Sequence, residues 1–139
     1  MDIRKEDDIL EATLSLAGKG YAEAYDFLLD AYEKAPGNHG PQTMYFLACL
    51  AGGDNRPEEA LGWLRKAITE NGWWYRPEVL EDEDLALLKK DPAFLALRSV
   101  SDARYAAAAA KAEAQFSWKE KTAAKLFLAV HGNTQNGPT

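Results

Sequence analysis

A repeated helical pattern constrains this 139-residue chain more than any other feature. Small and apolar residues recur at a constant offset of 36 residues. This offset aligns Ala24 with Ala60, Leu28 with Leu64, Ala31 with Ala67 and Pro36 with Gly72. In each copy the apolar residues share one helical stripe and a turn follows, as in a half-buried helix. A shorter apolar helix precedes each copy, so the pattern predicts two antiparallel helical hairpins.

The composition favours an all-α fold. The chain has 24 Ala and 17 Leu against 3 Val and 3 Ile, which suits helices rather than strands. Its net charge of −6 disfavours nucleic acid and anionic membrane surfaces as partners. A single cysteine excludes an internal disulfide, the N-terminus has no secretory pattern, and no apolar run is long enough to span a bilayer. We expect a cytoplasmic protein.

The second hairpin resembles the tetratricopeptide repeat, a helix-turn-helix unit with a period near 34 residues. Leu47-Ala48 occupy the Leu-Gly pair of the family's first helix, and Ala60, Leu64 and Ala67 occupy three characteristic positions of its second helix. Met44, Ala51 and Gly72 depart from the usual Trp, Tyr and Pro. The first copy fits only after a slip of one residue, so the resemblance is to a degenerate pair of repeats.

A long helix is predicted after the repeats. Asp91 is a good N-cap, and Pro92 suits the first helical position, so a helix can run from there to about Ala114. The Asp-Pro-x-Phe sequence resembles the segment that often closes bacterial tetratricopeptide arrays. The residues that we expect on its inward stripe are Phe94, Leu97, Ser101, Tyr105, Ala108 and Ala112.

The C-terminal residues have a different character. Residues 116–124 are polar and predict a linker, whereas Leu126-Phe127-Leu128-Ala129-Val130 is a continuous apolar run typical of a buried parallel strand. With His131-Gly132-Asn133, this run resembles the strand and oxyanion-hole loop of α/β-hydrolases of the carboxylesterase and phospholipase kind. The alternative is a polar tail with an accidental His-Gly pair. The resulting domains are a helical domain at 1–115, a linker at 116–124 and the start of a truncated α/β-hydrolase domain at 125–139.

The sequence contains no complete catalytic or metal site. Hydrolases of this kind need a Gly-x-Ser-x-Gly nucleophile, and the four serines lack flanking glycines. The resemblance implies that His131, Gly132 and Asn133 would shape an oxyanion loop without being catalytic. His39, His131 and Cys49 share no ligand spacing, so we expect no metal and no cofactor. Cys49 fits a small buried hydrophobe better than a catalytic thiol.

Two surfaces are candidates for binding a protein or peptide. The resemblance implies a concave face that presents Tyr45 and Cys49, with Gln42 at its rim. The aromatic cluster of Trp63, Trp73, Trp74 and Tyr75 could form a second site, or the rings could simply plug the end of the second hairpin. The acidic residues at 78–84 could attract a basic peptide or could be a solvated face.

These observations predict an interaction module. We expect a non-catalytic, tetratricopeptide-like front end of a serine α/β-hydrolase, whose partner is a protein, a peptide or the attached hydrolase domain. The alternative is a stand-alone adaptor whose C-terminal residues cap the array or stay disordered. An exposed Ala-rich helix face could also support a homodimer.

Overall fold

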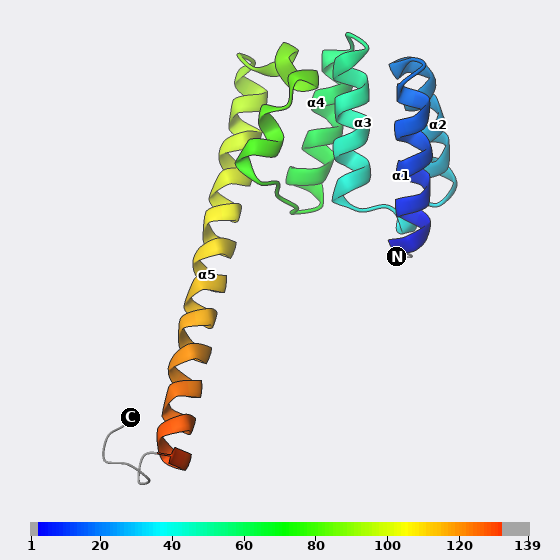
Figure 1. The fold of residues 1–139 in the computed structure, drawn as a ribbon. Helices are drawn as coiled ribbons and strands as arrows, with labels where there is room; N and C mark the ends of the chain where they lie inside the picture. Colours follow the sequence, from blue (N-terminus) through cyan, green and yellow to red (C-terminus); the bar gives the residue numbers. More distant parts are fainter. Residues whose placement is uncertain (1–2, 132–139) are drawn as a thin grey trace. The chain divides into compact units, whose positions relative to one another are not determined.

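The computed structural model of the protein describes residues 3–131 and contains helices only within that range. The predicted all-α class is confirmed. Four helices form two successive hairpins (Figure 1), and a fifth, much longer helix ends the described chain. The bounds are α1 Ile3–Ala17, α2 Tyr21–Lys34, α3 Pro41–Gly53, α4 Pro57–Arg65 and α5 Pro92–His131. Short helical turns lie between them: η1 Pro36–Asn38, η2 Lys66–Glu70, η3 Pro77–Glu81 and η4 Glu83–Leu88.

Prolines and left-handed residues set several of these boundaries. Pro41, Pro57 and Pro92 each stand at a helix start, where a missing N–H costs no helical hydrogen bond. The turn after α3 uses Asn55 at a φ of 64°, a conformation that asparagine tolerates better than most residues. The π-helical turn η2 ends before Gly72, whose φ of 72° favours glycine.

The core lies between the two hairpins. The aligned repeat positions are all buried in it: Ala24, Leu28, Ala60 and Leu64 have no exposed surface. Helix α3 is the central element, because it contacts α2, α4 and η4 and contributes an almost continuous run of buried residues from Leu47 to Gly52. The small residues in the repeat allow these helices to approach closely.

A third layer follows α4 but is built differently. The turns η3 and η4 pack where a full helix would otherwise stand, and they bury Leu80, Leu85 and Leu88. This stretch contains only 3-10 turns, because Asp82 interrupts them with an extended ψ of 140° and caps η4 by accepting a hydrogen bond from the Asp84 N–H.

The first turns of α5 complete this layer. Ser101 Oγ accepts from the Tyr75 N–H at 2.8 Å and donates to the Tyr75 carbonyl at 3.2 Å. Arg104 donates to the carbonyls of Ile68 at 2.6 Å and Trp73 at 2.9 Å. Phe94, Leu97 and Ser101 are buried, as predicted, so this part of α5 closes the core.

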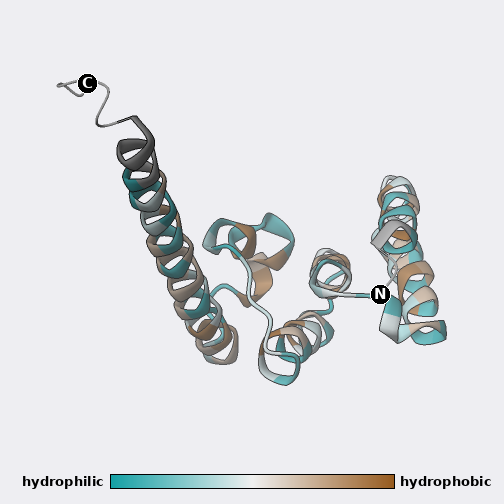
Figure 2. Ribbon diagram, turned by 90° about the horizontal axis from the view of Figure 1, so that it is seen from below, coloured by the Kyte–Doolittle hydropathy of each residue, from teal (hydrophilic) through white to brown (hydrophobic). Residues whose placement is uncertain are grey.

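The remainder of α5 forms a separate unit, Ala106–Thr139, of which the structure describes residues 106–131. Its side chains are largely exposed between Ala106 and Glu120, and Ala112 does not continue the buried stripe. Residues 116–124, predicted as a linker, are helical. Figure 2 shows hydrophilic and hydrophobic residues interleaved along α5.

The predicted strand is not formed. Residues 126–130 continue α5 as far as His131. A strand needs a neighbouring strand for its backbone hydrogen bonds, and the described residues supply none, whereas a helix satisfies the same groups locally. None of the described helices is both long and apolar enough to cross a membrane.

Candidate interaction site

The predicted concave face of α3 is covered by the chain's own third layer. Tyr45 donates its hydroxyl hydrogen bond to Asp82 at 2.7 Å and also lies 3.3 Å from the Val79 carbonyl. Its ring lies 5.8 Å from that of Tyr75. Cys49, one helical turn further along α3, is buried. The η3–η4 segment thus occupies the surface that the resemblance assigned to a ligand.

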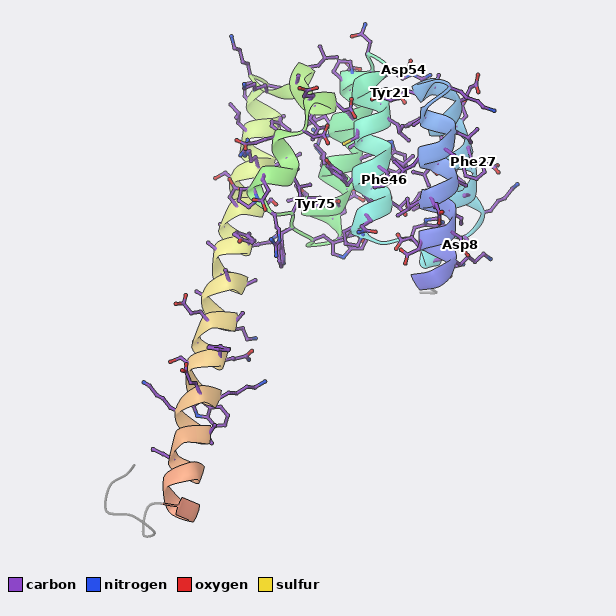
Figure 3. All side chains as sticks on the ribbon, viewed as in Figure 1. Asp8, Tyr21, Phe27, Phe46, Asp54 and Tyr75 are labelled. Atoms are coloured by element: carbon purple, nitrogen blue, oxygen red, sulfur yellow. The ribbon has the colours of Figure 1, made fainter. Side chains whose placement is uncertain are left out.

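Glycines at the end of α3 permit this close approach. A Cβ on Gly52 would lie 2.1 Å from the Asp84 carbonyl oxygen, and one on Gly53 would overlap the Tyr21 ring. The Tyr21 hydroxyl donates to Asp84 at 3.1 Å. Figure 3 places Tyr21 at the same end of the molecule as Asp54, just beyond α3. The Gly52-Gly53 pair therefore allows α2, α3 and η4 to meet.

The electrostatics of this face oppose ionisation of its side chains. Burial and neighbouring carboxylates raise the pKa of the Cys49 thiol to about 12, although a hydrogen bond from Tyr45 lowers it. Burial, with a further contribution from the bond to Asp82, raises the pKa of Tyr45. Partial burial raises the pKa of Asp84, despite the opposing effect of the Tyr21 hydroxyl. The thiol stays protonated near neutral pH, so it is a poor nucleophile.

Cys49, Asp82 and Asp84 are the one group of possible metal ligands within the described residues. Their ligand atoms lie within 4.8 Å of one another. Both carboxylates already accept hydrogen bonds from tyrosine hydroxyls, and a metal would require the thiolate that burial disfavours. The arrangement fits a hydrogen-bonded structural contact better than a metal centre.

A row of aromatic rings crosses from α2 to α4 and η1. The Trp63 Nε1–H donates to the Tyr25 hydroxyl at 2.9 Å. Tyr32 packs edge-on against Trp63 at 5.5 Å and against His39 at 5.9 Å. Trp63 is only partly buried, so it combines a structural contact with an accessible edge.

The other predicted binding residues differ in how exposed they are. Gln42 is exposed in the first turn of α3. Trp73 is partly buried, and its backbone N–H donates to the Ala67 carbonyl at 3.0 Å. Trp74 is 40% exposed and packs edge-on against Tyr105. Tyr75 is buried, with its hydroxyl donating to the Pro41 carbonyl at 2.6 Å (its place is labelled in Figure 3). The aromatic cluster is therefore split between structural and accessible rings.

The predicted oxyanion-loop residues lie at and beyond the end of α5. His131 is the last residue of that helix, and Gly132 and Asn133 lie outside the described residues. Their role stays a prediction.

Sequence reasoning missed a buried polar cluster beneath the first hairpin. Glu6, His39 and Thr43 are each at most 5% exposed and are joined by hydrogen bonds. The spacing of four residues between His39 and Thr43 is a signal that could have paired these two. Nothing in the sequence signals that Glu6, more than thirty residues earlier, joins them.

Comparison with known proteins places the chain in a family. Residues 5–109 match the family described as "A/B hydrolase-like, N-terminal domain". The chain belongs to this family. The match covers both helical hairpins, the third layer and the start of α5, so the helical part itself is hydrolase-associated.

A solved structure shares both sequence and fold with the chain. It is the crystal structure of an uncharacterized protein from Bacillus cereus ATCC 10987, with 33% sequence identity and a TM-score of 0.64. The similarity covers 73% of this chain and 33% of that one, so the aligned region spans about a third of the longer protein. A search of functionally curated proteins gives no match.

Proposed function

We propose that the chain is the non-catalytic N-terminal interaction module of a serine α/β-hydrolase of the esterase or phospholipase kind. The observation that carries the proposal is the family match over residues 5–109, which ties the helical part to hydrolases. The aligned region spans a third of the Bacillus cereus chain, which is consistent with one module of a longer protein. The absence of Gly-x-Ser-x-Gly from the sequence supports a role other than catalysis for this part.

The hairpins would act as a tetratricopeptide-like scaffold. The aligned pairs Ala24 with Ala60 and Leu28 with Leu64 are fully buried, so the repeat in sequence is a repeat in packing. Such arrays gain stability from contacts between neighbouring units and offer extended surfaces to partners.

Partner contact in this proposal depends on the accessible members of the predicted set. Gln42 and Trp74 are exposed, and Trp63 and Trp73 are partly exposed. Tyr45 and Cys49 would have a structural role inside the array, where they hold η3–η4 against α3. The partner would be the following hydrolase domain, and aromatic side chains at such an interface would supply most of the binding energy.

The first test is to sequence the coding DNA beyond the codon for Thr139. The proposal expects an open frame that encodes a further strand, a Gly-x-Ser-x-Gly elbow, an acidic residue and a histidine, in that order. His131-Gly132-Asn133 would then precede the elbow as oxyanion-loop residues, with 125–139 as the start of that domain. A stop codon directly after Thr139 would overturn the proposal and leave a stand-alone adaptor.

A second test uses the longer protein and p-nitrophenyl butyrate. We expect hydrolysis by the longer protein that is lost when the elbow serine is replaced by alanine, and none by residues 1–139. In the longer protein, Trp74→Ala should alter kcat/KM, whereas Gly62→Ala, at an open position on α4, should not. Equal activity of residues 1–139 would contradict a non-catalytic role.

A further inference from the structure

A cavity of about 340 Å³ lies where η3 and η4 meet the first turns of α5. Leu80, Leu85 and Phe94 form its apolar wall, and each is at most 3% exposed. Small-molecule sites have volumes of about 300–1,000 Å³ and combine apolar walls with a few polar groups. The cavity lies at the lower end of this range, so it suits a small ligand with an apolar part.

The Arg98 guanidinium, which lines the cavity, has donor capacity to spare. Its Nη2 atom lies 3.4 Å from the Pro77 carbonyl and 3.3 Å from Glu81 Oε1, and its Nε atom lies 3.6 Å from Asp102 Oδ2. Charge-assisted hydrogen bonds of this group are normally about 2.7–2.9 Å long, so all three contacts are long. The side chain is 26% exposed, and its planar group can donate two parallel bonds to a carboxylate.

Acidic side chains line the same cavity. Glu81 and Glu83 are both exposed there. None of the ion pairs in the described part of the chain involves Glu83, so its carboxylate is available to an ammonium group. Asp82 is less available, because its two oxygens already accept from the Asp84 N–H and the Tyr45 hydroxyl.

Charges of both signs therefore surround an apolar wall. Lys89 supplies a second cation, and it too takes part in no ion pair among residues 3–131. An anionic ligand would be repelled by Glu81 and Glu83, and a cationic ligand would be repelled by Arg98 and Lys89. A ligand that carries both charges can place each one beside a group of opposite sign.

We propose that this cavity binds a free apolar α-amino acid, of the size of leucine or phenylalanine, in its zwitterionic form. The ligand carboxylate accepts from Arg98, its ammonium group lies against Glu83, and its side chain packs on the apolar wall. The residues that we propose for contact with the hydrolase domain do not line this cavity, so either proposal can fail alone.

The test uses three probes that share a benzyl group. L-phenylalanine carries both charges, 2-phenylethylamine lacks the carboxylate, and 3-phenylpropionate lacks the ammonium group. Binding to residues 1–139 is followed by the backbone amide NMR signals of Leu85, Ala86 and Lys89, which line the cavity. We expect L-phenylalanine to shift these signals at millimolar concentration, and each analogue to bind at least tenfold more weakly.

Arg98→Gln removes the group that we assign to the ligand carboxylate. We expect this variant to bind L-phenylalanine at least tenfold more weakly than the parent protein does. The matched control is Arg76→Gln, because Arg76 is an exposed arginine that lies 3.9 Å from Glu78 and does not line the cavity. It should leave the affinity unchanged. Urea denaturation of both variants shows that they are folded.

A steric variant provides an independent check. Ala86 is exposed and lines the cavity, so Ala86→Leu should narrow the site and weaken binding of L-phenylalanine at least fivefold. Ala96→Leu, at an exposed position of α5 outside the cavity, should leave binding unchanged. Three results would overturn the proposal: no response to 10 mM L-phenylalanine, an analogue that binds as tightly as L-phenylalanine, or unchanged affinity in Ala86→Leu or in folded Arg98→Gln.

Discussion

Two stretches of the same helix show how differently helical structure can be supported. In residues 92–105, α5 buries Phe94, Leu97 and Ser101 and is held by side-chain hydrogen bonds to the preceding segment. In residues 106–120, the side chains are largely exposed, and Phe116 and Trp118 are 68% and 65% accessible. The first stretch is a helix because it packs, whereas the second relies on alanine, lysine and glutamate propensity.

The largest difference between the stretches should appear when a phenylalanine is removed from each. Phe94→Ala should lower the free energy of unfolding by about 3–5 kcal/mol, because it leaves a cavity beneath η4 and α5. Phe116→Ala should change it by less than about 0.5 kcal/mol, since that ring is exposed. Urea denaturation of both variants measures the contrast. Similar losses would mean that the second stretch is packed in solution.

Two glycine substitutions test how closely the first unit is packed. Gly52→Ala should cost about 3 kcal/mol, because the new methyl group collides with the Asp84 backbone. Gly62→Ala, on the open side of α4, should instead stabilise the protein by about 0.5–1 kcal/mol. Thermal unfolding followed by circular dichroism gives both values. A neutral Gly52→Ala would show that η4 does not rest on α3.

A pair of serines compares the two stretches of α5 through hydrogen bonding. Ser101→Ala should lower the free energy of unfolding by about 1–3 kcal/mol, because the Tyr75 N–H loses its buried acceptor. Ser117→Ala, at an exposed position, should change it by less than about 0.5 kcal/mol. Amide hydrogen exchange at Tyr75 should also accelerate only in Ser101→Ala. Unchanged protection there would contradict the hydrogen bond between the Tyr75 N–H and Ser101.

The smallest effect is expected from removing the second stretch altogether. A chain that ends at Tyr105 should keep the denaturation midpoint of residues 1–139, because the first unit contains its own core. The mean residue helicity of the shortened chain would reveal how much of 106–131 is helical in the parent. A midpoint lowered well beyond measurement error would show that the first unit depends on the second.

The repeat made much of the first unit predictable. Apolar spacing located the four helices of the hairpins, and Pro92 marked the start of α5. The spacing did not reveal that η3 and η4 cover Tyr45. That contact depends on Tyr45 reaching Asp82 and on Gly52 admitting the Asp84 backbone, and each pair is more than thirty residues apart. The predicted strand failed for a similar reason: an apolar run of five residues fits a helix or a strand, and the neighbouring elements decide between them.

The sequence by itself determined the helical class and the hairpin repeat, since these depend on local propensity and periodicity. The hydrolase resemblance was drawn from residues 126–133, whereas the family match lies in the helical part at residues 5–109. Only the tertiary structure decided which polar groups are brought together and buried. Glu6 reaches Thr43 and His39 through helix packing, and Tyr45 reaches Asp82 in the same way. Hydrogen bonds between distant residues require a fixed three-dimensional arrangement, and no periodic pattern along the chain encodes them.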